Sequence, residues 1–330
     1  MSVRDLLIVG AGPSGLSAAI AAKRRGLDYQ VLEQGTLVNS IYRFPPQMVF
    51  FTTPELLEVG GLPFVSPYEK PTRAEALRYY RRVVDTYDLQ VAFEEPVLSI
   101  QLEDDAGGDG GRVFAIETGS GGGRRIRHAR MVVLAIGYFD RPNRLNVPGE
   151  DLPHVHHFYS EPHPYYRRRV VIVGGANSAA EWALDLFRAG ASVTLVHRRA
   201  ELKSTIKYWV RPDIENRIKE GSIAARFNTH VTEIRPASVV VSTGTAVEEL
   251  AADAVFLLVG YHADWDLMAA AGVVMNERRV PAYDPATFET NVPGLFVAGG
   301  ALAGMDTGNI FIENGRFHGE KIVEVIAGRL

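Results

Sequence analysis

The chain has 330 residues, of which 46% are hydrophobic and 22% are charged, and it carries a formal net charge of −4. This length and composition suffice for two hydrophobic cores, so we expect two domains. The slightly acidic balance gives no electrostatic reason to bind nucleic acid or an anionic membrane, and no apolar run reaches the roughly 18 residues that cross a bilayer.

The N-terminal apolar segment predicts a short strand that runs directly into a glycine loop. Residues 6–15 read Leu-Leu-Ile-Val-Gly-Ala-Gly-Pro-Ser-Gly, with Gly10, Gly12 and Gly15 in the spacing of a dinucleotide-binding turn. In such a turn the first glycine permits the tight bend, the second admits the pyrophosphate, and the third allows close helix–strand packing. Because the segment is a strand and not a signal peptide, we expect a cytoplasmic protein.

A helix over residues 16–25 and a strand over residues 29–32 follow, and the strand ends at Glu33. A carboxylate about 20 residues after the glycine loop accepts hydrogen bonds from a ribose and repels a 2′-phosphate. The amino end of the helix stabilises the phosphates. We therefore predict a site for a dinucleotide without a 2′-phosphate. Its expected residues are Gly10, Gly12, Pro13, Ser14, Gly15, Glu33 and Gln34.

The next part of the chain predicts a covering segment, one helix and several short strands. Residues 39–64 are rich in Phe, Thr and Pro and are expected to lie over the cofactor. The predicted elements are a helix over residues 72–87 and strands over residues 97–102, 112–118, 124–128 and 131–136. The last strand ends at Gly137, where a nucleotide can approach the backbone. The Gly-rich segments 104–111 and 119–123 predict hairpin tips.

A second glycine fingerprint begins after the strand at residues 170–173. It is degenerate, because Ala176 and Ala179 replace the second and third glycines. Its next strand, residues 192–196, ends at three basic residues, which attract a 2′-phosphate. We predict an NADPH site here, against the alternative of a non-binding unit with a solvated basic face. Its expected residues are Gly174, Ala176, Asn177, Ser178, His197, Arg198 and Arg199.

The remaining sequence returns to the first domain. A strand at residues 295–298 ends at Gly299 and Gly300, and a final helix is predicted over residues 308–327. We predict an α/β fold of two Rossmann-like domains of the three-layer ββα type, with the NADPH domain inserted in the FAD domain. The expected ranges are 1–155 and 262–330 for FAD, and 156–261 for NADPH.

Histidines cluster before the second fingerprint, at residues 154, 156, 157 and 163. No carboxylate or cysteine stands at a metal-ligand spacing from them, so we predict no metal site. His262 and His318 lie nearer the predicted flavin. Each is expected to make a structural hydrogen bond, with proton donation as the alternative role.

The carboxylate at Glu33 and the basic residues at 197–199 together predict FAD and NADPH as cofactors, and hence a redox enzyme. The sequence contains no cysteine, which excludes chemistry carried by a disulfide or an Fe–S cluster of the chain itself. Electrons must therefore leave directly from the flavin to an external acceptor.

Four segments resemble the low-molecular-weight thioredoxin reductase family and, more closely, the bacillithiol disulfide reductases of the YpdA type. They are residues 15–20, Gly-Leu-Ser-Ala-Ala-Ile; 38–42, Val-Asn-Ser-Ile-Tyr; 147–153, Val-Pro-Gly-Glu-Asp-Leu-Pro; and 311–319, Phe-Ile-Glu-Asn-Gly-Arg-Phe-His-Gly. The resemblance covers nearly the whole chain and implies a homo-oligomer that uses FAD and NADPH. The expected flavin-binding residues also include Asn39, Ser40, Val97, Gly137, Gly299 and Gly300.

Two positions depart from relatives. Ser14 stands where that family has a cysteine, and Gly300 stands where many members of the wider superfamily have an aspartate that binds the flavin ribityl chain. A serine hydroxyl cannot form a mixed disulfide and is a poor nucleophile without a base. Because it stands at the position of that cysteine, Ser14 is expected near the flavin ring. There it is the candidate catalytic position and is expected to act as a hydrogen-bonding group.

The predicted function is hydride transfer from NADPH to flavin, followed by electron transfer to a small-molecule or small redox-protein acceptor. A low-molecular-weight disulfide is one candidate acceptor. The alternatives are ferredoxin/flavodoxin–NADP reductase or flavin monooxygenase activity, and a flavin-binding redox sensor that does not turn over.

Overall fold

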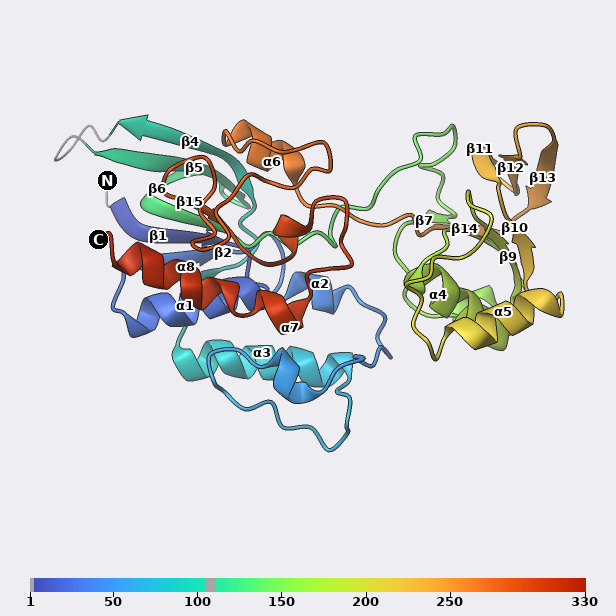
Figure 1. Ribbon diagram of the computed structural model, residues 1–330, viewed down its shortest axis with the longest axis horizontal. Helices are drawn as coiled ribbons and strands as arrows, with labels where there is room; N and C mark the ends of the chain where they lie inside the picture. Colours follow the sequence, from blue (N-terminus) through green and yellow to red (C-terminus); the bar gives the residue numbers. More distant parts are fainter. Residues whose placement is uncertain (1–2, 105–110) are drawn as a thin grey trace. The chain divides into compact units, whose positions relative to one another are not determined.

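The computed structural model describes residues 3–104 and 111–330, and these form two compact units (Figure 1). The first unit comprises the chain up to Arg141 together with Tyr261–Leu330, and the second comprises Pro142–Gly260. The sequence predicted the change of unit at residue 156. In the structure the change comes earlier, because Leu145, Val147 and Leu152 pack against the core of the second unit.

The first unit is built on a seven-stranded sheet in the order β3-β2-β1-β6-β5-β4, with β15 pairing β6. Its strands are β1 (Val3–Val9), β2 (Tyr29–Leu32), β3 (Val91–Ala92), β4 (Val97–Asp104), β5 (Arg112–Ser120), β6 (Gly123–Leu134) and β15 (Leu295–Val297). Strands β3, β2, β1, β6 and β15 are parallel, whereas β4, β5 and the first half of β6 form an antiparallel meander.

Strand β6 belongs to both parts of this sheet. The sequence predicted two strands, over residues 124–128 and 131–136, but the structure has one. Its first half pairs with β5 and its second half with β1. The two residues between the predicted strands alternate in burial, since Ala129 is buried and Arg130 is exposed, so the extended chain continues through them. The tip predicted at residues 104–111 falls mostly on residues outside the described ranges.

Alternation along β1 produces the layers of the first unit. Leu6 and Ile8 pack against helices on one face, whereas Leu7 and Val9 pack against the meander side. The helices on the first face are α1 (Pro13–Arg24), α3 (Arg73–Tyr87) and α8 (His318–Ala327), seen together beside the sheet in Figure 1. Helix α3 begins at the predicted place because Thr72 and Glu75 form a capping box.

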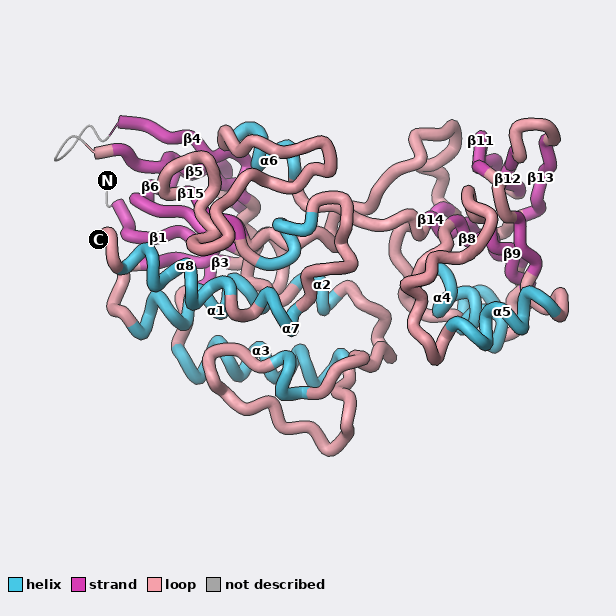
Figure 2. The backbone as a smooth tube through the Cα atoms, in the orientation of Figure 1, coloured by secondary structure: helices cyan, strands magenta, loops and turns pink. Residues whose placement is uncertain are grey.

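The last predicted helix is interrupted. Instead of one helix over residues 308–327, the chain forms α7 (Ile312–Gly315) and then α8, as Figure 2 shows. The interruption follows Gly315, whose carbonyl accepts a hydrogen bond from the Ser14 hydroxyl. Two further short helices of this unit are α2 (Asn39–Tyr42) and α6 (Trp265–Ala270).

The second unit repeats the three layers. A five-stranded parallel sheet in the order β10-β9-β8-β14-β7 lies between helices and a three-stranded antiparallel sheet. Along β8, Val170 and Ile172 face the helices, and Val171 and Val173 face the small sheet. The elements are β7 (Val155–His156), β8 (Arg169–Val173), α4 (Asn177–Arg188), β9 (Ser192–Val196), α5 (Arg211–Lys219), β10 (Ala224–Arg226), β11 (His230–Arg235), β12 (Ser238–Ser242), β13 (Val247–Ala251) and β14 (Ala254–Leu257).

The predicted fold class is thus confirmed, since both units are α/β with Rossmann-like parallel sheets. Within the described ranges, none of the helices combines the length and apolar character needed to cross a membrane.

Candidate functional site

The first glycine loop joins β1 to α1 with no room for side chains on two of its glycines. A Cβ on Gly10, whose φ is +106°, would lie 2.4 Å from the carbonyl oxygen of Ala135, and one on Gly15 would lie 2.0 Å from the carbonyl of Gly10. Gly12 differs, because no described atom lies within 4 Å of its Cβ position. Open space at the amino end of α1 fits a pyrophosphate.

Glu33 directly follows β2 and is fixed by the backbone. Its carboxylate accepts hydrogen bonds from the Ala11 N–H at 2.8 Å and the Gly35 N–H at 2.9 Å. The residue is 5% exposed, and this burial raises the pKa of the carboxyl group, although the two N–H donors act in the opposite direction. Each oxygen keeps a further lone pair, which fits the hydroxyls of a ribose.

Asp140 gathers the polar side chains of the segment after Glu33. Its carboxylate accepts from Asn39 Nδ2 at 3.0 Å, Arg43 Nη1 at 3.1 Å, Gln34 Nε2 at 3.3 Å and Ser40 Oγ at 3.5 Å. Its side chain is 16% exposed. Sequence reasoning named Gln34, Asn39 and Ser40 but missed Asp140, whose signal was an acid three positions after Gly137.

Ser14 lies against two glycines that are far away in the sequence. Its hydroxyl donates to the Gly315 carbonyl at 3.0 Å. A Cβ on Gly299 would lie 2.4 Å from the Ser14 oxygen, and one on Gly315 would lie 3.2 Å from it. Among the described residues the partner of this hydroxyl is a carbonyl, not an imidazole or carboxylate. Ser14 therefore has a positioning contact, and none of the residues that the structure describes serves as a base that would make it a nucleophile.

His318 also contacts Gly299. The Gly299 N–H donates to His318 Nδ1 at 3.1 Å, and the imidazole stacks on Phe288 with ring centroids 4.4 Å apart. Burial and, to a lesser extent, the Lys321 charge lower the pKa of His318, which favours the neutral ring that this bond requires. His262 instead contacts the carbonyl of Ala263 at 2.7 Å.

The other predicted flavin residues lie at strand ends of the same unit. Val97 opens β4, two positions after Glu95, whose N–H donates to the Glu33 carbonyl at 2.9 Å. Gly137 follows β6, and Gly299 and Gly300 follow β15. The carboxyl edge of the parallel sheet is where such folds bind dinucleotides, and the predicted residues after β1, β2, β6 and β15 share that edge.

In the second unit, the glycine loop after β8 is equally close-packed. A Cβ on Gly174 would lie 2.6 Å from the Leu258 carbonyl, and Ala176 forms the N-cap of α4. The Asn177 side chain donates to the Thr205 carbonyl and accepts from the Lys207 N–H at 2.9 Å. This amide therefore secures the segment after β9, whereas Ser178 has no such engagement among the described residues.

The basic cluster after β9 is divided between core and surface. His197 is 7% exposed and its ring lies under the second glycine loop, within 2.5 Å of a Cβ position on Gly175. Burial lowers the pKa of His197, and the charges of Arg199, Arg198 and Lys203 lower it further. This imidazole is therefore neutral near pH 7.

Arg198 and Arg199 are exposed, and neither side chain has a hydrogen bond or ion pair with any residue the structure describes. The Lys203 N–H donates to the Gly175 carbonyl at 2.8 Å, which holds a third cation beside the loop. Sequence reasoning missed Lys203, although a basic residue four positions after Arg199 was a visible signal. Three cations beside a helix N-terminus fit an anionic ligand.

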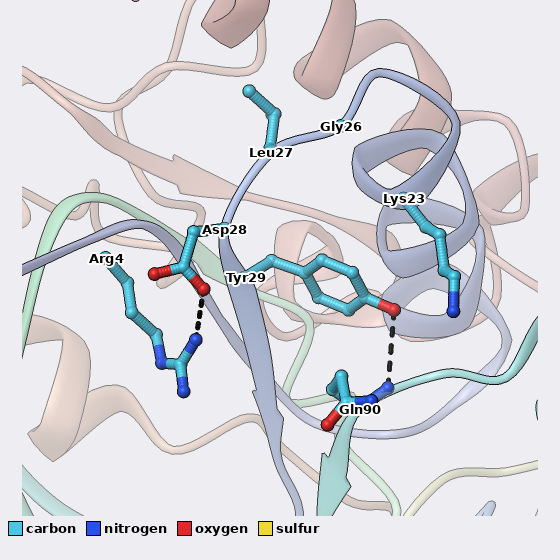
Figure 3. Close-up of a pocket in the computed structure, with 7 residues that line it drawn as sticks. All are labelled: Arg4, Lys23, Gly26, Leu27, Asp28, Tyr29 and Gln90. Carbon is cyan, nitrogen blue, oxygen red and sulfur yellow. Dashed lines mark hydrogen bonds and ion pairs between the residues drawn. The ribbon is translucent and has the colours of Figure 1, made fainter.

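One pocket of the first unit lies at the opposite end of its sheet. Figure 3 shows it at the beginning of β1 and β2, where the Tyr29 hydroxyl accepts from the Gln90 N–H at 3.3 Å and Arg4 pairs with Asp28. Its lining residues are Arg4, Lys23, Gly26, Leu27, Asp28, Tyr29 and Gln90. Because dinucleotides bind at carboxyl ends of parallel strands, this pocket is separate from the candidate site.

Known proteins match this arrangement over its full length. The pyridine nucleotide-disulphide oxidoreductase family matches residues 7–299. Bacilliredoxin reductase Bdr of Bacillus subtilis is 40% identical over 325 residues, which are 98% of this chain and 97% of that protein. A ferredoxin–NADP reductase of Ignicoccus hospitalis is 27% identical over 304 residues, 90% of each chain.

Among solved structures, the bacillithiol disulfide reductase Bdr (YpdA) from Bacillus cereus superposes with a TM-score of 0.94 at 39% identity and covers 100% of both chains. The resemblance predicted from the sequence is confirmed, and this sequence contains no cysteine. The chain belongs to the pyridine nucleotide-disulphide oxidoreductase family, with the Bdr (YpdA) reductases among its relatives.

Proposed function

We propose that the protein is an NADPH-dependent flavoprotein reductase that holds FAD in the first unit and NADPH in the second. The observation that supports this most strongly is the contrast between the two strand-end sites. Glu33 is a buried carboxylate, whereas Arg198, Arg199 and Lys203 are cations without ion-pair partners in the described ranges. A carboxylate selects free ribose hydroxyls, and the cations select a 2′-phosphate.

The first unit has the groups that FAD requires. The space at Gly12 receives the pyrophosphate, the amino end of α1 stabilises its charge, and Glu33 accepts hydrogen bonds from the adenosine ribose. When bound, FAD supplies the two-electron chemistry that no side chain of this chain provides. Asp140 keeps Asn39 and Ser40 in place beside that site.

The second unit has the groups that distinguish NADPH from NADH. Arg198 and Arg199 pair with the 2′-phosphate, and Lys203 adds a charge from the neighbouring segment. The neutral His197 ring supports the glycine loop from below and contributes packing instead of charge.

The proposed acceptor is a low-molecular-weight disulfide, the class of substrate that the name of the Bacillus cereus relative gives for that protein. One NADPH and one proton would convert one disulfide to two thiols and NADP⁺. Because this sequence has no cysteine, no disulfide of the chain takes part in that exchange. A ferredoxin is the second candidate acceptor, supported by the relationship to ferredoxin–NADP reductases. A homo-oligomeric state and a cytoplasmic location are parts of the same proposal.

An anaerobic stopped-flow titration of the yellow protein with NADPH, and separately with NADH, tests the proposal. We expect NADPH to bleach the flavin absorbance much faster than NADH does. The reduced protein is then mixed with bacillithiol disulfide, ferredoxin or oxygen, and the acceptor that restores the absorbance fastest identifies the second half-reaction. Failure of both nucleotides to bleach the flavin would contradict the enzyme and support a sensor.

A further inference from the structure

Tyr138 occupies the space that a side chain at position 300 would need. A Cβ built on Gly300 would lie 2.6 Å from Cδ1 and 2.9 Å from Cε1 of the Tyr138 ring. The two residues meet because they follow paired strands: Tyr138 comes after β6, and Gly300 comes after β15, with Leu134 and Val297 as neighbours in the register. The aromatic ring and the bare glycine therefore form one packed unit.

The Tyr138 ring is anchored, but its hydroxyl is not. The ring packs against the apolar cluster that contains Ala301 and Leu302. No residue that the structure describes forms a hydrogen bond with the hydroxyl. Burial raises the pKa of this phenol, and the Glu313 carboxylate adds to the effect, so the group stays protonated and remains a donor. A half-buried donor that has no acceptor among the described residues fits an acceptor on a ligand.

The order of strands indicates which part of a ligand reaches Tyr138. At the carboxyl edge the strands run β2, β1, β6 and β15. Glu33 at β2 takes the adenosine ribose and Gly12 at β1 takes the pyrophosphate under the proposed function. The half of FAD beyond the pyrophosphate then extends over the ends of β6 and β15, and its ribityl hydroxyls and ring carbonyls are hydrogen-bond acceptors.

We propose that Tyr138 is a flavin-binding residue of this chain, and that its hydroxyl donates a hydrogen bond to an oxygen on the ribityl–isoalloxazine half of FAD. Tyr138 thereby provides, from the end of β6, the polar contact that the bare Gly300 cannot make from the end of β15. The inference rests on the proposed FAD site. It adds a position to the flavin-binding residues that the glycine fingerprints identify.

The first test is Tyr138→Phe, which removes the hydroxyl and keeps the ring that packs on Gly300. Loss of one hydrogen bond corresponds to roughly a 2- to 12-fold increase in the FAD dissociation constant. The measurement is FAD fluorescence released from the purified holoprotein on dilution. Tyr166→Phe is the matched control, because the Tyr166 ring also covers a glycine, lying 3.0 Å from the Cβ position of Gly190, but in the second unit.

The second test exchanges the side chains of the pair. Gly300→Asp alone is expected to weaken FAD retention and lower the melting temperature, since the new side chain collides with Tyr138. The double variant Tyr138→Ala with Gly300→Asp is expected to recover both quantities relative to Gly300→Asp, because it vacates that space. A double variant no better than Gly300→Asp would contradict the packing on which the inference depends.

The outcomes separate the inference from the proposed function. Wild-type affinity for FAD in Tyr138→Phe, with the flavin still reduced by NADPH, overturns the inference and leaves the proposed function standing. A wild-type protein that binds no FAD overturns the proposed function itself. Increased FAD release in Tyr138→Phe, at an unchanged melting temperature of the flavin-free protein and with no change in Tyr166→Phe, supports the inference.

Discussion

Ser14 donates a 3.0 Å hydrogen bond to the backbone carbonyl of Gly315, a residue 301 positions further along the chain. The bond joins the first glycine loop to the end of α7. Gly299 lies beside the same hydroxyl, so three distant segments meet at one small side chain. Any larger group at position 14 must displace part of this contact.

Replacing Ser14 with Ala tests this role. We expect the free energy of unfolding to fall by about 1–2 kcal/mol, because the Gly315 carbonyl loses its donor in a part-buried place. The rate of flavin bleaching by NADPH should change by less than about three-fold, which corresponds to well under 1 kcal/mol of barrier. Denaturant unfolding and stopped-flow absorbance measure the two quantities. A Ser14→Ala protein of normal stability that cannot pass electrons to any acceptor would show that the hydroxyl is catalytic.

Removing the Asp140 carboxylate should loosen the segment that carries Gln34, Asn39 and Ser40. We expect hydrogen exchange in residues 34–43 and FAD release to be fastest in Asp140→Ala, slower in Asp140→Asn and slowest in the wild type. The asparagine variant is intermediate because its side-chain amide keeps one acceptor oxygen. Hydrogen–deuterium exchange by mass spectrometry and FAD fluorescence give these rates. The control is Asp28→Asn, which alters an exposed ion pair with Arg4 at the other end of the sheet. Equal exchange in all four proteins would contradict the role.

The three cations of the second unit should set the preference for NADPH. The double variant Arg198→Ala/Arg199→Ala is expected to raise the NADPH dissociation constant about 10- to 100-fold, the range for a lost hydrogen bond to a charged group, and to leave NADH almost unaffected. Lys203→Ala should give a smaller change in the same direction. Calorimetric titration with both nucleotides measures this, with Arg211→Ala, which removes an exposed ion pair on α5, as control.

The ion pair between Glu95 and Arg127 makes the free energy of unfolding depend on pH. Arg127 donates two hydrogen bonds, at 2.6 Å and 2.8 Å, to Glu95, which is 4% exposed, and these bonds lower the pKa of the Glu95 carboxyl below its ordinary 4.5. A carboxyl with a lowered pKa stabilises the fold above its unfolded-state pKa, and this contribution is lost as pH falls through the folded-state pKa.

Glu95→Gln should therefore lower the free energy of unfolding at pH 7 by about 1–2 kcal/mol, because the amide keeps one acceptor oxygen for Arg127 but removes the charge and the second acceptor oxygen. The difference from wild type should shrink steadily below pH 4.5, the ordinary value for this carboxyl. Urea unfolding of the two proteins from pH 7 to pH 3 gives the comparison. A difference that stays constant across this range would show that the pair contributes through packing and not through charge.

The parts of the site that could be predicted from the sequence are those encoded locally. Gly10, Gly12 and Gly15 specify a turn within a few residues, and Glu33 follows from the length of one βα unit. His197 was harder, because three basic residues in a row suggest one surface. In the structure the His197 N–H continues the strand ladder to the Arg226 carbonyl, so its side chain turns inward while Arg198 and Arg199 stay outside.

The parts that could not be predicted depend on contacts between segments distant in sequence. Nothing near Tyr138 indicates that its ring fills the space above Gly300. The acid at position 140 is visible after Gly137, but the sequence does not indicate that four donors converge on it. The sequence predicted one helix over residues 308–327. The break after Gly315 arises from tertiary packing against Ser14 and Gly299, which outweighs local propensity.

Strand β6 also determines when the first unit can be completed during synthesis. Its hairpin with β5 needs only neighbouring residues, so it can form as soon as that stretch leaves the ribosome, whereas its pairing with β1 joins residues more than 100 positions apart. The last position beside β6 belongs to Leu295–Val297, which emerges only after the whole of Pro142–Gly260. The nascent second unit can therefore fold while the sheet of the first is still open on one side.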